Sequence, residues 1–184
     1  MDNNSPNPFK NNHLNRRHPS RNSVMEHLDN RSIILYVTAV TDKRIPVLAN
    51  DDAHECLKKA WEMAQNWFVG RYTIMPDHTH FFCAPGCYPF SGFHQWIRCW
   101  KGLAAKLFWN TPTGKNVLAS MNWNENVRKP PLWQRDCWDR QLRSGESYDE
   151  KWNYVRNNPV RAGFVEKAED WKYQGELHTL IWME

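Results

Sequence analysis

Two histidines separated by a single residue form the part of this sequence best suited to metal chemistry. His78 and His80 lie in residues 78–84, which are predicted to form a β-strand. Residues two apart on a strand share a face, so the two imidazoles would lie side by side as half of a metal site. The pair would also suit two hydrogen-bonded core histidines, and the spacing alone leaves both interpretations open.

A second polar pair occurs near the C-terminus. Tyr154 and Asn158 are four residues apart in a predicted helix, so they would share one helix face. A tyrosine can act as a covalent nucleophile, and an amide oxygen can bind a metal ion. If this face lay opposite His78 and His80, a divalent ion would have three ligands beside a phenol, which suits phosphoryl transfer. The simpler alternative is a packing aromatic and a helix-end residue before Pro159.

The elements that must position these residues can be predicted from residue spacing. Apolar and β-branched runs predict strands over 33–41, 69–75 and 78–84, and over part of 132–143. Apolar residues at helical spacing predict helices over 51–67, 91–109 and 147–158. The polar, Pro/Gly/Asn-rich segment 111–131 is expected to be a long loop. This order indicates an α+β, ferredoxin-like domain with a mostly antiparallel sheet and helices packed on one side.

Composition bounds the domain organisation and the cellular setting. Residues 1–31 are rich in Asn, Arg, Ser and Pro, which predicts a disordered basic arm before a single domain over 32–184. The five scattered cysteines favour reduced thiols in a cytoplasmic protein. Without an apolar run of about 18 residues or an apolar N-terminal segment, secretion and membrane insertion are disfavoured.

The charge pattern is compatible with a nucleic-acid partner. The formal net charge is +4, and tryptophans occur among basic residues in several segments, as expected for phosphate contacts and base stacking. No glycine-rich phosphate loop and no Gly-x-Ser-x-Gly elbow occurs, which argues against nucleotide-dependent motors and α/β-hydrolases. The candidate DNA-binding residues are Arg98, Lys101, Trp133, Arg135, Arg140, Arg143, Arg156 and Arg161.

Four motifs in fixed order connect these residues to a known family. They are Met-Pro-Asp-His-Thr-His at 75–80, Leu-Trp-Gln-Arg-x-x-Trp-Asp-Arg at 132–140, Tyr-Val-Arg-Asn-Asn-Pro-Val-Arg-Ala-Gly at 154–163, and Glu-Asp-Trp at 169–171. Together they closely resemble the REP-associated tyrosine transposases, a branch of the single-tyrosine HUH endonucleases related to the insertion-sequence-200-like transposases.

The resemblance implies a specific reaction and site. It implies Mg²⁺ or Mn²⁺ bound by His78, His80 and Asn158, with Tyr154 as the nucleophile. The substrate would be single-stranded DNA near hairpins of repetitive extragenic palindromes, cleaved and rejoined through a 5′-phosphotyrosine without a nucleotide cofactor. The resemblance also implies a bacterial, nucleoid-associated location in the cytoplasm. A monomer and a homodimer both remain open, as does action of the tyrosine on its own chain or on a partner's site.

One departure and two alternatives accompany this interpretation. The family usually has a bulky apolar residue where Thr79 stands, but that side chain points away from the metal face, so ligation should survive. The main alternative is a catalytically silent, domesticated sequence-specific DNA-binding protein on the same fold. A small-molecule phosphoesterase would need a second His-x-Thr/Ser motif, and the candidate at 18–20 lies in the predicted arm.

Overall fold

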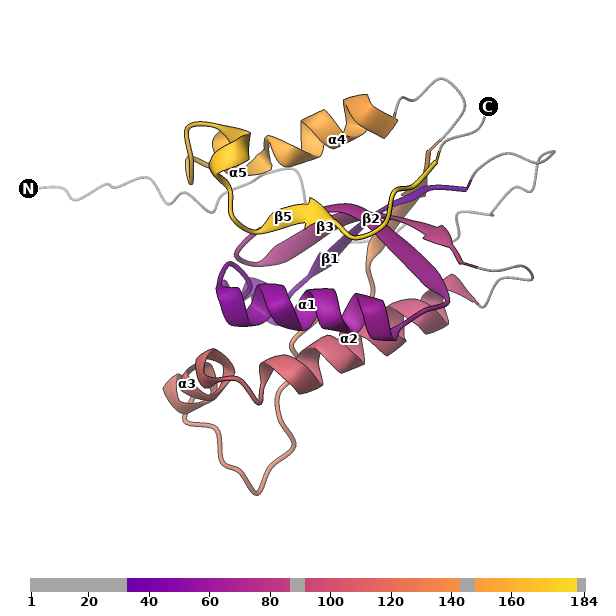
Figure 1. The fold of residues 1–184 in the computed structure, drawn as a ribbon. Helices are drawn as coiled ribbons and strands as arrows, with labels where there is room; N and C mark the ends of the chain where they lie inside the picture. Colours follow the sequence, from indigo (N-terminus) through magenta and orange to yellow (C-terminus); the bar gives the residue numbers. More distant parts are fainter. Residues whose placement is uncertain (1–32, 87–91, 143–147, 182–184) are drawn as a thin grey trace, which may run out of the picture.

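An antiparallel sheet forms the centre of the computed structural model, which describes residues 33–86, 92–142 and 148–181. Its strands are β1 (Leu35–Val40), β2 (Trp67–Ile74), β3 (His78–Pro85), β4 (Trp138–Gln141) and β5 (Gln174–Glu176). They lie in the order β4-β1-β3-β2-β5, so β3, which carries both histidines, is the middle strand (Figure 1). The α+β fold with an antiparallel sheet is therefore confirmed. The predicted arm, residues 1–31, lies outside the described residues.

Two long helices cover one face of the sheet (Figure 1). They are α1 (Asp51–Met63) and α2 (Phe93–Phe108), and they contact each other side by side. Phe81 of β3 is fully buried beneath them, with ring centroids of Trp61 and Trp100 at 5.3 and 5.6 Å. Many of the tryptophans therefore build the core, because large apolar rings contribute most of the buried area in a domain of this size.

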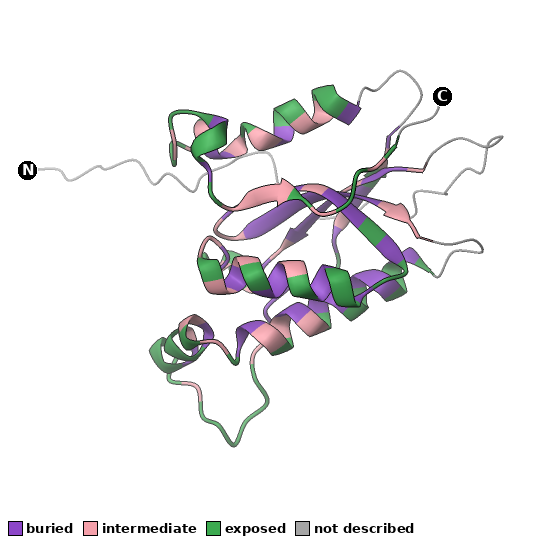
Figure 2. Ribbon diagram, in the orientation of Figure 1, coloured by how far each residue is buried: buried purple, intermediate pink, exposed green. Residues whose placement is uncertain are grey.

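The opposite face of the sheet carries a smaller core beneath α4 (Tyr148–Arg156). Phe82 and Val155 are completely buried there, and the centroids of the Tyr148 and Phe82 rings are 4.9 Å apart. The burial of the strands between the two layers of helices is visible in Figure 2. The expected packing on one side thus holds for α1 and α2, whereas α4 lies on the other side. The reason is that alternate residues of β3 give the sheet a second apolar face, which must also be covered.

The helix predicted over 147–158 is shorter than expected. α4 ends at Arg156, a turn follows at Asn157, and the short helix α5 (Asn158–Arg161) begins directly after it. Pro159 causes the break, because its nitrogen has no proton to donate to the Val155 carbonyl four residues earlier and its ring would clash with that carbonyl in a continuous helix. Tyr154 and Asn158 therefore lie on two consecutive helices, and the predicted single helix through Asn158 is wrong.

The polar segment 111–131, predicted to be a loop, contains the helix α3 (Pro112–Ser120). Thr111 caps this helix by accepting a hydrogen bond from the Gly114 amide at 3.0 Å, and the Thr113 amide donates to Asp52 of α1 at 3.0 Å. The segment projects beyond α2, away from the sheet (Figure 1). The Thr-Pro start is a helix-capping signal that the polar composition obscured.

The C-terminal segment adds the edge strand β5, which the sequence did not predict. A 3-10 turn, η2 (Ala168–Asp170), precedes it, and another, η1 (Asp42–Arg44), follows β1. Trp171 fixes this segment to the sheet, because its buried Nε1 donates to the Ile74 carbonyl at 2.9 Å. Among the described residues, no helix is long and apolar enough to cross a membrane.

Candidate functional site

His78 and His80 lie next to each other on the face of β3 that α4 partly covers. Their ring centroids are 4.7 Å apart and their planes are nearly perpendicular, and both side chains are buried. Thr79 points to the opposite face, where it is fully buried and its hydroxyl donates to the Thr73 carbonyl at 3.3 Å. The strand alternation expected from the sequence is therefore present, and Thr79 satisfies its own polar group away from the histidines.

The Nδ1 atom of His78 is held by the residue that precedes it in the chain. It lies 2.5 Å from Oδ1 of Asp77, and Oδ2 of Asp77 accepts from the Arg44 guanidinium at 2.9 Å. Burial raises the pKa of the Asp77 carboxyl, but the contacts with His78 and Arg44 outweigh it, so this pKa lies below its usual value. An ionised Asp77 accepts a hydrogen bond from Nδ1–H, which leaves the lone pair of His78 on Nε2.

His80 is held from β1. Its Nδ1 atom lies 2.8 Å from the Tyr36 hydroxyl and 2.8 Å from the Thr38 hydroxyl, and Thr38 is its cross-strand partner. Burial, followed by the charge of His78, lowers the pKa of His80 well below its ordinary value, so the ring is neutral. Burial raises the pKa of Tyr36 to about 12, so this phenol keeps its proton.

These contacts test whether the histidines suit a metal ion. Each Nδ1 atom has a side-chain partner, so Nε2 of each ring is the nitrogen available as a ligand, which is the usual arrangement around metal-bound histidine. The described residues contain no group of three or more His, Cys, Asp or Glu that could hold a metal. A third protein ligand must therefore be of another type, and a carboxamide oxygen such as that of Asn158 is chemically suitable. The donor set fits a divalent ion.

Tyr154 and Asn158 are connected by Arg161. The Arg161 guanidinium lies 4.2 Å from the centre of the Tyr154 ring, and it donates to the Tyr154 carbonyl at 3.0 Å. It also donates to Oδ1 of Asn158. The Tyr154 side chain is 63% exposed, so a large substrate can reach its hydroxyl.

Electrostatic effects connect this segment to the histidine face. Burial is the main reason that the pKa of Tyr36 is raised, but the charges of Tyr154 and Arg161 also act on it. Arg161 likewise contributes, after burial and His78, to the lowered pKa of His80. Val155 of α4 packs in one cluster with Phe82, which shares the β3 face of the histidines, so the end of α4 lies on their side of the sheet.

Two of the predicted DNA-binding residues have structural roles instead. Lys101 is buried, and its ammonium donates to the carbonyls of Gln134 and Asp136 at 3.1 and 2.9 Å. Trp133 is buried against Trp100, with ring centroids 5.4 Å apart. Neither side chain is available for DNA, so these two predictions are wrong. The helical spacing predicted a basic flank on α2, but it could not reveal that the loop before β4 folds over Lys101.

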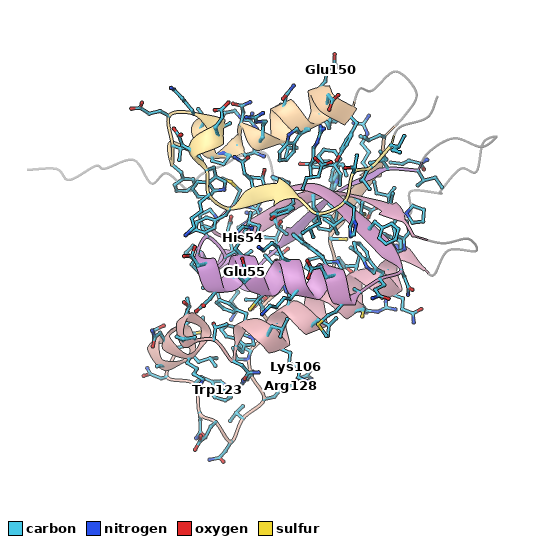
Figure 3. The ribbon with its side chains drawn as sticks, viewed as in Figure 1. His54, Glu55, Lys106, Trp123, Arg128 and Glu150 are labelled. Atoms are coloured by element: carbon cyan, nitrogen blue, oxygen red, sulfur yellow. The ribbon has the colours of Figure 1, made fainter. Side chains whose placement is uncertain are left out.

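The remaining predicted DNA contacts differ in their surroundings. Arg98, Arg135 and Arg140 are exposed, and Arg156 is paired with Glu169 at 3.0 Å. Arg143 lies outside the described residues. Two further basic residues, Lys106 of α2 and Arg128 of the segment 111–131, are on the side of α1 and α2, whereas Glu150 of α4 marks the opposite side (Figure 3).

The sequence interpretation missed the residues that support the histidines. Asp77 stands only within the motif at 75–80, and Tyr36 and Thr38 only within the strand predicted over 33–41. The period-two alternation of β1 could have indicated that Tyr36 and Thr38 share a face. The pairing of β1 with β3, which brings that face to His80, is a tertiary contact that the sequence pattern did not specify.

Comparisons with known proteins identify the fold. No protein-family model matches the chain. A Haemophilus influenzae protein with the provisional name REP-associated tyrosine transposase is 33% identical over 49 residues, which is 27% of this chain and 28% of that protein. The match thus covers less than two thirds of the relative. The structure of a REP-associated tyrosine transposase bound to a REP hairpin superposes with a TM-score of 0.55 at 16% identity, over 83% of this chain and 82% of that one.

The chain has the fold of a REP-associated tyrosine transposase. The family resemblance inferred from the sequence motifs is confirmed at this level. A provisionally named transposase from Deinococcus radiodurans gives a TM-score of 0.47 at 15% identity, over 72% of this chain and 94% of that one. Within the REP-associated tyrosine transposase fold, the candidate site lies between the middle strand of the sheet and the junction of two short helices.

Proposed function

We propose that this protein is a transposase that binds hairpin DNA and cleaves and rejoins an adjoining single strand. The observation that carries the proposal is the pair of buried histidines, each held through Nδ1, on the sheet face shared with the helix of Tyr154. The solved relative with this fold is bound to a REP hairpin, which favours the same class of substrate here.

In the proposed reaction, the Tyr154 oxygen attacks the phosphorus of a phosphodiester. The phenol proton passes to water, the bond between phosphorus and the 3′ oxygen breaks, and that oxygen takes up a proton. The product is a 5′-phosphotyrosine with a free 3′-hydroxyl, so attack by a 3′-hydroxyl reverses the step and joins strands. One ester replaces another, and no nucleotide cofactor is required.

A divalent ion, Mg²⁺ or Mn²⁺, would be held by His78 and His80 through Nε2 and by the Asn158 amide oxygen, and it would offset negative charge on the phosphate. The protein's own contribution is to orient both imidazoles through their Nδ1 atoms, so that Nε2 of each ring faces the ion. Asp77 does so for His78, and β1 does so for His80. A nucleoid-associated location belongs to the same proposal.

The test is formation of a covalent protein–DNA adduct. The full chain is incubated with Mn²⁺ and a pool of 3′-labelled hairpin oligonucleotides carrying randomised single-stranded flanks, because cleavage leaves the 3′ portion on the tyrosine. An adduct that survives denaturing electrophoresis is expected for the wild type, and it should disappear in Tyr154→Phe. Tyr173→Phe is the matched control, since Tyr173 packs against Trp171 at 5.4 Å and has no place in the proposed reaction.

A second candidate function is favoured by one contact. Arg161 donates to the amide oxygen of Asn158 and covers the Tyr154 ring. This arrangement is expected of a DNA-binding protein in which Arg161 keeps Asn158 from a metal and Tyr154 from a phosphate. This protein would bind hairpin DNA and form no adduct under any metal condition. Binding by the wild type and by Tyr154→Phe with equal affinity, without any adduct, would establish it.

A further inference from the structure

Arg161 forms a hydrogen bond with the Asn158 oxygen that the proposed metal site needs as a ligand. Its guanidinium donates to Oδ1 of Asn158, the oxygen expected to be the third protein ligand. An amide oxygen that accepts from a cation has its electron density drawn away from a metal ion. In the geometry of the free chain, Arg161 and a divalent cation therefore compete for Asn158.

The charge of Arg161 acts in the same direction. Arg161 contributes electrostatically at both His80 and Tyr36, so its charge lies within range of the histidine face. A guanidinium keeps its charge at every physiological pH, so it opposes a divalent cation at that face permanently. Both effects lower the affinity of the free chain for the metal.

Arg161 also has no anionic partner within the described residues. Three other arginines near the sheet are ion-paired: Arg44 with Asp77, Arg71 with Asp149, and Arg156 with Glu169. Arg161 instead makes its contacts to a ring, a carbonyl and an amide. A guanidinium held by neutral groups beside an exposed phenol is suited to bind a phosphate, which would match its planar donors better than a single amide oxygen does.

We propose that Arg161 is the positioning residue that couples DNA binding to metal binding: the scissile phosphate draws its guanidinium away from Asn158 and neutralises its charge, so that Asn158 becomes free to bind the metal. The inference rests on the proposed function, whose site it uses. Under this proposal, all three protein ligands are available to the metal only when a phosphodiester lies beside Tyr154. Because coupling is reciprocal, metal must tighten DNA binding by the same factor by which DNA tightens metal binding.

The first experiment needs no DNA and no activity. Mn²⁺ affinity of the full-length free protein is measured by electron paramagnetic resonance for the wild type, Arg161→Ala and Asn158→Ala. Arg161→Ala should bind Mn²⁺ on the order of tenfold more tightly than the wild type, within the usual range of coupling between two sites. The double variant with Asn158→Ala should lose the part of that gain that comes from the freed amide oxygen. Lys167→Gln, which removes one positive charge from the same C-terminal segment, should leave Mn²⁺ affinity unchanged.

The second experiment measures the coupling in a Tyr154→Phe background, where the ring and carbonyl remain but DNA is not cleaved. Hairpin affinity is measured by fluorescence anisotropy with and without Mn²⁺. Mn²⁺ should tighten binding on the order of tenfold with Arg161 present and should have little effect with Arg161→Ala. Arg161→Lys should keep part of the effect, because it retains the charge without the planar fork.

The outcomes separate the inference from the proposed function. If wild type and Arg161→Ala bind Mn²⁺ equally, or if Mn²⁺ changes hairpin affinity equally in both, the role of Arg161 is overturned even when Tyr154 forms an adduct. If neither protein binds Mn²⁺ and no adduct forms, the proposed function itself fails. Thermal unfolding of each variant, expected within a few degrees of the wild type, excludes misfolding as the cause of a loss.

Discussion

Asp77 and His78, adjacent in the sequence, are joined side chain to side chain by a contact of 2.5 Å between Oδ1 and Nδ1. Neighbouring residues on a strand point to opposite faces, so this contact depends on Asp77 lying in the tight connection before β3 rather than in the strand. Arg44 holds the other carboxylate oxygen and so fixes its orientation. The pair therefore determines which nitrogen of His78 is free to act as a ligand.

Replacing Asp77 should weaken metal binding without removing a metal ligand. Asp77→Asn keeps an oxygen near Nδ1 but removes its charge, and loss of such a partner typically costs about 10- to 100-fold in metal affinity or activity. We expect Mn²⁺ affinity to fall by about tenfold, measured by titration calorimetry. Arg44→Gln is the graded control, since it leaves the contact with His78 in place and should have a smaller effect. Unchanged Mn²⁺ affinity in Asp77→Asn would mean that Asp77 stabilises only the connection before β3.

His80 should depend on Tyr36 and Thr38 jointly. Both hydroxyls lie 2.8 Å from the same Nδ1 atom, so either can orient the ring when the other is removed. Tyr36→Phe and Thr38→Val should each lower single-turnover cleavage modestly, whereas the double variant should lose more than the product of the two effects. A double-mutant cycle measures this coupling, which is expected to be about 0.5–3 kcal/mol for partners in one network. Additive effects would show that one hydroxyl alone orients His80.

Much of the sheet and the placement of the histidine pair could be predicted from local sequence patterns. Strand alternation correctly indicated that His78 and His80 share a face, because the side-chain period of a strand holds wherever the strand lies in the fold. The break before Pro159 was partly visible as well, since the effect of a proline on a helix is local. The error was to extend the helix through Asn158 instead of starting a new one there.

The parts that could not be predicted depend on distant contacts. Nothing in the spacing of α2 distinguishes Lys101, which is buried under the loop before β4, from Arg98, which is exposed three residues earlier. In the same way, Tyr36 becomes a partner of His80 only through the register between β1 and β3. Residue spacing indicates which side chains share a face of a helix or strand. Which other segment packs against that face depends on the tertiary fold.

Lys101 and Arg98 should therefore behave differently in DNA binding. Lys101→Met leaves the carbonyls of Gln134 and Asp136 without their donor, so it should reduce the free energy of unfolding by about 1–3 kcal/mol in urea. The slope of hairpin affinity against salt concentration should not change. Arg98→Ala should leave stability within about 0.5 kcal/mol. If Arg98 contacts a phosphate, the salt slope should fall by about 0.7–0.9.

Two glycines in neighbouring helices should respond in opposite ways to the same substitution. A Cβ atom at Gly114, in the first turn of α3, would lie 2.0 Å from the Phe108 carbonyl oxygen, whereas a Cβ atom at Gly102 in α2 would meet nothing within 4 Å. Gly114→Ala must displace backbone at the corner between α2 and α3, which should cost about 1–3 kcal/mol. Gly102→Ala should stabilise the protein by up to about 1 kcal/mol, because alanine favours a helix interior. Urea unfolding of both variants measures the difference in the free energy of unfolding. Hairpin binding by Gly114→Ala tests whether the segment 111–131 contacts DNA. Equal stability of the two variants would mean that the corner is not packed against Gly114 as described.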